Sequence, residues 1–193
     1  MRIFLIKRKT LFLFMIMMLC AGFLFMAGVQ NTAEVFNDEW GEEKLLPIYR
    51  VEKGEEKVCA LTFDAAWDDH DTDELIKILN ENEVKATFFV VGDWARKYPE
   101  SVKKFADNGH EIMNHSNTHP HIDQLSEQKV KEEISACADT IESITGVRPT
   151  LFRGPYGEYN NTVIKVAKEQ GETVLQWDVE TLATLGKPDV ERV

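Results

Sequence analysis

The pattern of apolar and polar residues changes after residue 56. From Lys57 onward, short apolar runs alternate with longer segments in which apolar residues recur at helical spacing. The short runs predict five strands, at residues 57–63, 85–92, 110–115, 149–153 and 172–178. The longer segments predict four helices, at residues 72–83, 98–109, 126–146 and 161–171. This strict alternation predicts an α/β fold whose parallel sheet is covered by helices and is either open or closed as a barrel.

Residues with known positional preferences mark the ends of these helices. Thr72 and Ser126 precede apolar-periodic segments and are predicted N-caps. Pro99 lies in the first turn of its helix, where proline is tolerated. Gly109 and Gly146 follow the last periodic residues and are predicted helix stops.

The first thirty residues follow a different pattern. Four basic residues, the last at Lys9, precede an uncharged run at residues 11–29. This run is about as long as the roughly 20 residues that a membrane-spanning helix needs. Its length, and the lack of a clean small-residue cleavage site, favour an uncleaved signal anchor at residues 1–30 over a cleaved signal peptide.

This assignment gives an expected location and domain plan. By the positive-inside rule, we expect the rest of the chain to lie outside the cytoplasm, anchored to the membrane, or secreted if the signal is cleaved. Residues 31–56 are polar and acidic, which predicts a linker that ends in a short extended piece around residues 48–51. Residues 57–193 then form a single domain.

Charge and cysteine content narrow the possible partners. The chain carries a net charge of −11, and every acidic residue lies beyond the apolar run. This charge argues against nucleic acid as a partner and is compatible with a neutral or amino-sugar ligand. The export compartment permits a disulfide, but Cys59 and Cys137 lie in different predicted elements. We expect both to be small buried side chains.

Polar residues stand where the predicted strands end. Asp64, His115 and Arg153 follow three of the strands, while Trp177 and Asp178 end the last one. Because the carboxyl ends of parallel strands share one edge, we expect these side chains to converge on one site.

The segment "NHSNTHPH" at residues 114–121 suggests a metal site there. His115 and His119 are four residues apart, and neutral imidazole is a common ligand for zinc, iron, cobalt or nickel. Such a pair needs an oxygen ligand as third partner and an open position for water. Alternatively, the two histidines cap the long helix or bond the loop backbone.

The other strand-end residues also allow two interpretations each. Asp64 could be a general base for water, or a turn aspartate. Arg153 could hold a carboxylate through a bidentate pair, with or without chemistry attached. The "GPYG" turn that follows it could aim the backbone N–H of Tyr156 at a developing oxyanion.

Three of these segments carry a family resemblance. "LTFD" at 61–64, "HSNTH" at 115–119 and "RGPYG" at 153–157 resemble, in this order, the first three motifs of the NodB-homology polysaccharide deacetylases, carbohydrate esterase family four. The resemblance runs from about residue 57 to residue 178. "FDAAW" and "GDW" at 92–94 are more similar to the sporulation-associated branch than to the chitin or general peptidoglycan enzymes.

The resemblance implies a fold, an activity and residue roles. The fold would be a distorted (β/α) barrel, and the activity metal-dependent hydrolysis of N- or O-acetyl groups on a cell-surface glycan. Asp64 would be the base, Arg153 would orient it, and the Tyr156 backbone would be the oxyanion donor. The metal ligands would be His115 and His119. Pro155 within the third motif, and Trp177 at the end of the last predicted strand, are expected to contact the substrate.

The sequence departs from the family pattern in ways that affect the metal and the barrel. Ala65 stands where the family has a second aspartate that binds the metal. Asp68 and Asp69 are interpreted as solvated residues rather than replacement ligands, so we expect zinc, or cobalt or another first-row ion, to bind weakly. Ala183 and Thr184 stand where the family has an aspartate–tryptophan pair, and we expect a barrel truncated at its C-terminus.

Two functions follow from this sequence. One is metal-dependent deacetylation of an N-acetylated cell-wall or spore polysaccharide such as peptidoglycan. The alternative is a non-catalytic glycan-binding or spore-envelope protein that keeps the deacetylase fold.

Overall fold

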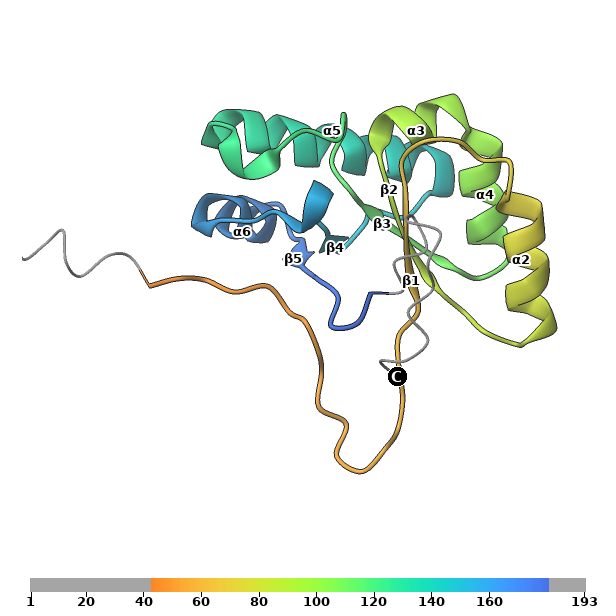
Figure 1. The fold of residues 1–193 in the computed structure, drawn as a ribbon. Helices are drawn as coiled ribbons and strands as arrows, with labels where there is room; N and C mark the ends of the chain where they lie inside the picture. Colours follow the sequence, from red (N-terminus) through yellow and green to blue (C-terminus); the bar gives the residue numbers. More distant parts are fainter. Residues whose placement is uncertain (1–42, 181–193) are drawn as a thin grey trace, which may run out of the picture. The chain divides into compact units, whose positions relative to one another are not determined.

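A five-stranded parallel sheet organises the part of the chain that the structure describes, residues 43–180 of a computed structural model. The strands are β1 (Thr62–Ala65), β2 (Thr87–Val90), β3 (Glu111–Asn114), β4 (Leu151–Phe152) and β5 (Thr173–Val174). They lie side by side in the order of the sequence (Figure 1). The predicted α/β class and parallel sheet are confirmed. Among the described residues β1 and β5 do not pair, so these strands form an open sheet with the sequential order that barrels use.

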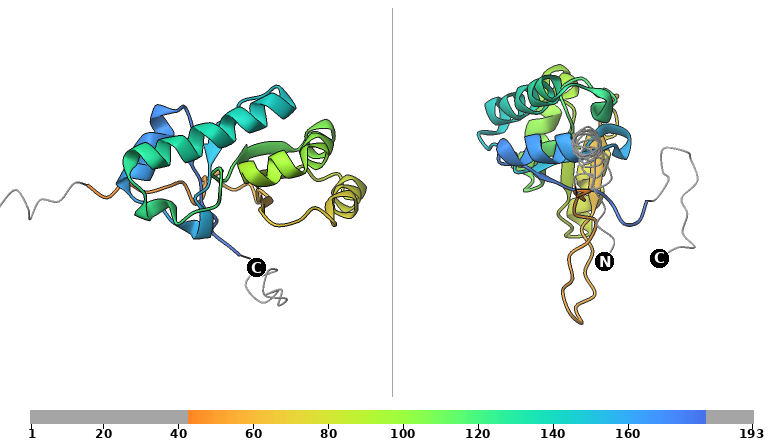
Figure 2. Two further views of the ribbon diagram at one scale, coloured as in Figure 1. Left: turned by 90° about the horizontal axis from the view of Figure 1, so that it is seen from above. Right: turned by 90° about the vertical axis from the view of Figure 1, so that its left-hand side faces the viewer.

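Five α-helices connect and cover these strands. They are α2 (Thr72–Glu81), α3 (Gly92–Lys97), α4 (Pro99–Asp107), α5 (Glu127–Thr145) and α6 (Asn161–Glu169). Two short 3₁₀ helices, η1 (Ile122–Gln124) and η2 (Pro155–Gly157), lie in the loops after β3 and β4. Right-handed crossovers between strands in sequential order place the connecting helices on one face of the sheet. The long α5 packs against α3, α4 and α6 on that face (Figure 2).

The hydrophobic core has two clusters that meet at α5. In the first, Phe88 and Ile112 of the sheet pack with Cys137 of α5. In the second, Phe152 of β4 packs with Ile134 of the same helix. Helix α5 contributes to both clusters and contacts the central strand β3, so it can fix the loop that follows this strand.

The extended piece expected around residues 48–51 lies beside β5. The N–H of Ile48 donates to the carbonyl of Val174 over 3.0 Å, and the N–H of Gln176 donates to the carbonyl of Ile48 over 2.8 Å. The N–H of Leu45 donates to Oδ1 of Asn161 over 2.8 Å. The two bonds of Ile48 cover backbone groups in and just after β5 that an edge strand would otherwise expose, while the Leu45 bond ties the same segment to α6.

The helix ends agree with the sequence in most positions. Ser126 is the N-cap of α5, Gly146 ends that helix at φ 75°, and Pro99 is the first residue of α4. Thr72 was wrongly predicted as an N-cap: the cap is Asp71, and Thr72 is the first helical residue, with its side chain buried. The sequence also did not predict α3, because its six residues show too little apolar periodicity.

The two cysteines have different environments. Cys137 is buried, as predicted, and burial raises the pKa of its thiol. Cys59 is exposed, so the prediction that it is buried was wrong. The reason is that β1 begins only at Thr62, which leaves residues 57–61 outside the sheet.

Within residues 43–180, no helix is both long enough and apolar enough to cross a membrane. The anchor predicted for residues 1–30 lies outside the described residues, as do residues 31–42 of the linker and the positions of Ala183 and Thr184.

Candidate functional site

Asp64 and Arg153 meet at the carboxyl edge of the sheet. Nη1 of Arg153 donates to Oδ1 of Asp64 over 2.8 Å. The pair is not bidentate, because Nη2 of Arg153 donates instead to Oγ1 of Thr62 over 3.0 Å. The guanidinium is buried and lies 4.0 Å from the ring centroid of Phe89. A buried guanidinium needs such a partner, and this geometry leaves Oδ2 of Asp64 available to the site.

His115 lies beside that free carboxylate oxygen. Its Nδ1 donates to the backbone carbonyl of Arg153 over 2.8 Å, so its Nε2 faces Asp64, 3.9 Å from Oδ2. Burial lowers the pKa of His115, although the charge of Asp64 acts in the opposite direction. A buried neutral imidazole whose Nδ1–H is held by a carbonyl is the usual arrangement of a histidine metal ligand.

His119 completes a pair of imidazoles. Its ring centroid lies 5.2 Å from that of His115, and burial lowers its pKa. Its Nδ1 is buried and has no hydrogen-bond partner among the described residues. Buried polar atoms normally have partners, so an unpartnered ring nitrogen next to a second imidazole suits a bound ion. The donor set of two imidazoles with Oδ2 of Asp64 nearby therefore fits a first-row divalent metal.

The loop that carries the two histidines has an unusual backbone. Ser116 and His119 adopt positive φ values of 67° and 60°. The N–H of His119 donates to Oγ of Ser116 over 3.1 Å. On α5, Glu133 accepts the N–H groups of Asn117 and Thr118 over 2.9 and 2.8 Å. The same carboxylate accepts the Thr118 hydroxyl over 2.9 Å, so one acidic side chain holds three donors of this loop.

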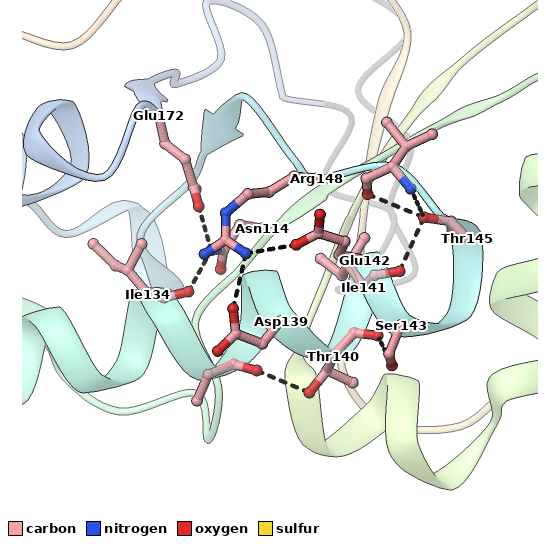
Figure 3. Close-up of polar contacts among 12 residues, drawn as sticks. Asn114, Ile134, Asp139, Thr140, Ile141, Glu142, Ser143, Thr145, Arg148 and Glu172 are labelled. Carbon is pink, nitrogen blue, oxygen red and sulfur yellow. Dashed lines mark hydrogen bonds and ion pairs between the residues drawn. The ribbon is translucent and has the colours of Figure 1, made fainter.

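Asn114, the last residue of β3, connects the histidine loop to α5 and to Glu172 through hydrogen bonds. This buried side chain accepts the N–H of Ser116 over 3.0 Å. It donates to the carbonyl of Ile134 on α5 and to Oε1 of Glu172 (Figure 3). Burial raises the pKa of Glu172 to about 8. Close by, Arg148 is paired with two acids near the end of α5, Asp139 and Glu142.

Sequence reasoning missed both supporting residues. Asn114 could have been suspected, since an amide stands on the strand face where Ile112 is apolar and packs against helices. Glu133 carries no such signal, because an acid beside the apolar stripe of a helix is ordinary.

The β1 side of the site offers fewer ligands. Ala65 has no ligand atom and packs against the first core cluster. The Asp68 carboxylate is paired with His70, and Oδ2 of Asp69 accepts the Ser101 hydroxyl over 2.7 Å. Both loop aspartates are therefore engaged with partners outside the histidine pair, whereas the sequence had predicted only solvated side chains.

The turn after β4 also lies beside His119. Tyr156 adopts φ 59°, is 57% exposed, and places its ring centroid 4.7 Å from that of His119. Pro155 is buried in this turn rather than facing solvent. The Trp177 ring lies 5.5 Å from the guanidinium carbon of Arg153. All the residues predicted for the site thus come from one edge of the sheet, with Pro155 beneath the surface.

Comparison with known proteins agrees with this geometry. Residues 51–175 match the family described as polysaccharide deacetylase. The chain belongs to that family. The resemblance found in the sequence is thereby confirmed, while the sporulation-associated branch stays a prediction.

Individual relatives show what the family contains. Over 123 residues the chain is 37% identical to a peptidoglycan-N-acetylglucosamine deacetylase of Bacillus cereus, covering 64% of this chain and 45% of that one. Its fold is similar to that of a CE4 family pseudoenzyme from Bacillus anthracis, with a TM-score of 0.70 and 30% identity over 73% of this chain and 50% of that one. A mutant of that pseudoenzyme with restored enzymatic activity aligns with a TM-score of 0.71 and 31% identity, over 73% and 52% of the two chains. The chain therefore spans about half the length of each of these relatives.

Proposed function

We propose that this polysaccharide deacetylase domain removes N-acetyl groups from a cell-wall or spore polysaccharide such as peptidoglycan. The observation that carries the proposal is the convergence of Asp64, Arg153, His115 and His119 at one edge of the sheet. The activity of the Bacillus cereus relative supports the choice of substrate class.

Deacetylases of this family generally depend on a divalent metal. In this chain His115 and His119 would hold it, with water as a further ligand, so that Asp64 stays free to act as a base; zinc is the ion that we expect. Such an ion polarises a carbonyl group and lowers the pKa of water.

The residues of the chain perform the remaining tasks. Arg153 holds one oxygen of Asp64, which orients the carboxylate and leaves Oδ2 to accept a proton from the attacking water. The water oxygen bonds to the acetyl carbon and, as the carbon–nitrogen bond breaks, Asp64 passes the proton that it took from the water to the leaving amine nitrogen. We propose that the backbone N–H of Tyr156 donates to the oxygen of the acetyl group as negative charge develops on it.

A location outside the cytoplasm fits this substrate. We propose that residues 1–30 anchor the protein to the cell membrane, which would place the domain beside the cell wall. The basic flank and the uncharged run support this part of the proposal.

A second candidate function is glycan binding without catalysis. Ala65 removes a potential ligand from the site, and a pseudoenzyme is among the similar structures. This candidate predicts binding of N-acetylated oligomers with no release of acetate, even at saturating zinc.

The test is Asp64→Asn, with acetate release from N-acetylglucosamine oligomers measured at saturating zinc. Asparagine keeps an oxygen for Arg153 but cannot accept the proton of water, so we expect the wild type to release acetate and the variant to release none. Asp73→Asn is the matched control, because Asp73 is an exposed partner of Lys104 on the surface. Circular dichroism should show an unchanged fold in both variants. Full activity in Asp64→Asn would remove Asp64 from the mechanism.

A further inference from the structure

Trp67 is the most exposed large apolar residue in residues 43–180, at 75%. It follows β1 in the loop that leads to α2. An indole normally contributes strongly to stability when it is buried, so an indole left in water contributes little to this fold. Exposed aromatic residues beside a site are typical of ligand-binding surfaces.

The loop that carries Trp67 is held in place. Nε1 of the buried Trp94 donates to the carbonyl of Asp68 over 2.9 Å. The carbonyl of Asp69 accepts the N–H of Thr72 over 3.1 Å. With the bond from Ser101 to the Asp69 side chain, these contacts fix the residues that directly follow Trp67. A ligand would therefore meet a surface that loses little conformational freedom on binding.

Trp67 lies next to the histidine pair. Its ring centroid is 5.4 Å from that of His119, and the exposed ring of Tyr156 is 4.7 Å from the same imidazole. The three rings come from the loops after β1, β3 and β4. A ligand bound at the histidines would therefore extend across exposed aromatic surface.

The chemistry around Trp67 favours a neutral or amino sugar. Asp68, Asp69 and Asp71 follow it closely in the sequence, and such a loop repels anionic ligands. The flat apolar face of an indole matches the face of a pyranose ring that carries C–H groups.

We propose that Trp67 is a stacking platform for a sugar ring of the glycan, next to the ring that occupies the histidine site. This inference rests on the proposed function, because it takes the ligand to be an N-acetylated polysaccharide. The platform contacts a ring face rather than an acetyl group or a metal, so it operates in the metal-free protein.

The experiment measures binding of an N-acetylglucosamine tetramer to the metal-free full chain by isothermal titration calorimetry. We expect Trp67→Ala to weaken binding about tenfold and Trp67→Phe to retain most of the affinity. Val147→Ala is the control: Val147 is 67% exposed but precedes β4, at the opposite end of the sheet. Its affinity should equal that of the wild type. Thermal melting would verify that each variant is folded.

Two results would contradict the proposal that Trp67 stacks on a sugar ring. One is equal tetramer affinity in the wild type and in Trp67→Ala, and the other is the absence of tetramer binding by the wild type. Acetate release separates this outcome from failure of the proposed function. Release of acetate without an effect of Trp67→Ala on binding would reject only the platform. Binding that depends on Trp67 without any release of acetate would reject the deacetylase proposal and support the platform.

Discussion

The loops after β3 and β1 form two sides of the site and differ in how they are built. The histidine loop, residues 115–119, presents two imidazoles and is held by side chains of β3 and α5. The β1 loop, residues 66–71, follows Ala65 at the end of the strand, and its first two acids, Asp68 and Asp69, are engaged with His70 and Ser101. The histidine loop is therefore preorganised to bind a metal. On the β1 side, the nearest possible ligand is Asp64, which belongs to the strand and not to the loop. This difference predicts weak metal binding.

Backbone strain supports this contrast. Two residues of the histidine loop that are not glycine adopt positive φ, a conformation that costs on the order of 1–3 kcal/mol each. Hydrogen bonds to a charged group contribute about 1.5–3 kcal/mol each, so the bonds to Glu133 can offset that cost. The chain thus keeps a strained loop where it holds the two histidines.

The largest effect on stability that we predict concerns Glu172, which bonds Asn114 under the histidine loop. Glu172 is 2% exposed, and its pKa is about 8 in the folded protein, above the value of an unfolded glutamate. Its contribution to stability is therefore fully present below pH 4.5 and is lost as the pH rises to 8. Glu172→Gln keeps an acceptor for Asn114 without a charge, so we expect a gain of roughly 2–4 kcal/mol at pH 8 and little gain at pH 4.5.

Urea denaturation at the two pH values measures this difference. Glu169→Gln, an exposed substitution on α6, is the control and should show no pH-dependent gain. Zinc affinity should stay unchanged in Glu172→Gln, because Asn114 keeps its bonds. An equal gain at both pH values would show that Glu172 is not the group that titrates.

A smaller effect, on zinc affinity, should follow from removing the Glu133 carboxylate that accepts hydrogen bonds from the histidine loop. Glu133→Ala removes the acceptor of three loop donors, so we expect zinc to bind about tenfold more weakly, a change of about 1.4 kcal/mol. Glu132→Ala is the matched control, since Glu132 is the preceding residue of α5 and its carboxylate accepts hydrogen bonds from Gln128 and Lys129 of its own helix. Calorimetric titration of both variants with zinc gives the comparison. Equal loss of zinc affinity in Glu133→Ala and Glu132→Ala would mean that the position of the histidine loop does not depend on Glu133.

The sequence predicted the features that follow from general rules of chain architecture. Strands that alternate with helices gave the parallel sheet, and the shared carboxyl edge brought Asp64 and Arg153 together across 89 residues. The geometry of individual contacts could not be predicted in this way. Arg153 divides its donors between Asp64 and Thr62, and Ile48 pairs with β5, because tertiary packing rather than local pattern decides both. The same reason explains why Cys59 is exposed although its segment has the composition of a strand.

The measurement that tests the difference between the two loops most directly is a zinc titration of the wild type and of Ala65→Asp. We expect the added carboxylate to tighten binding by roughly one to three orders of magnitude, at about 1.4 kcal/mol for each tenfold change. Ala66→Asp adds the same charge one residue later and should have a much smaller effect. Equal zinc affinity in the wild type and Ala65→Asp would contradict the account, because it would mean that another group already supplies the ligand that the β1 side of the site lacks.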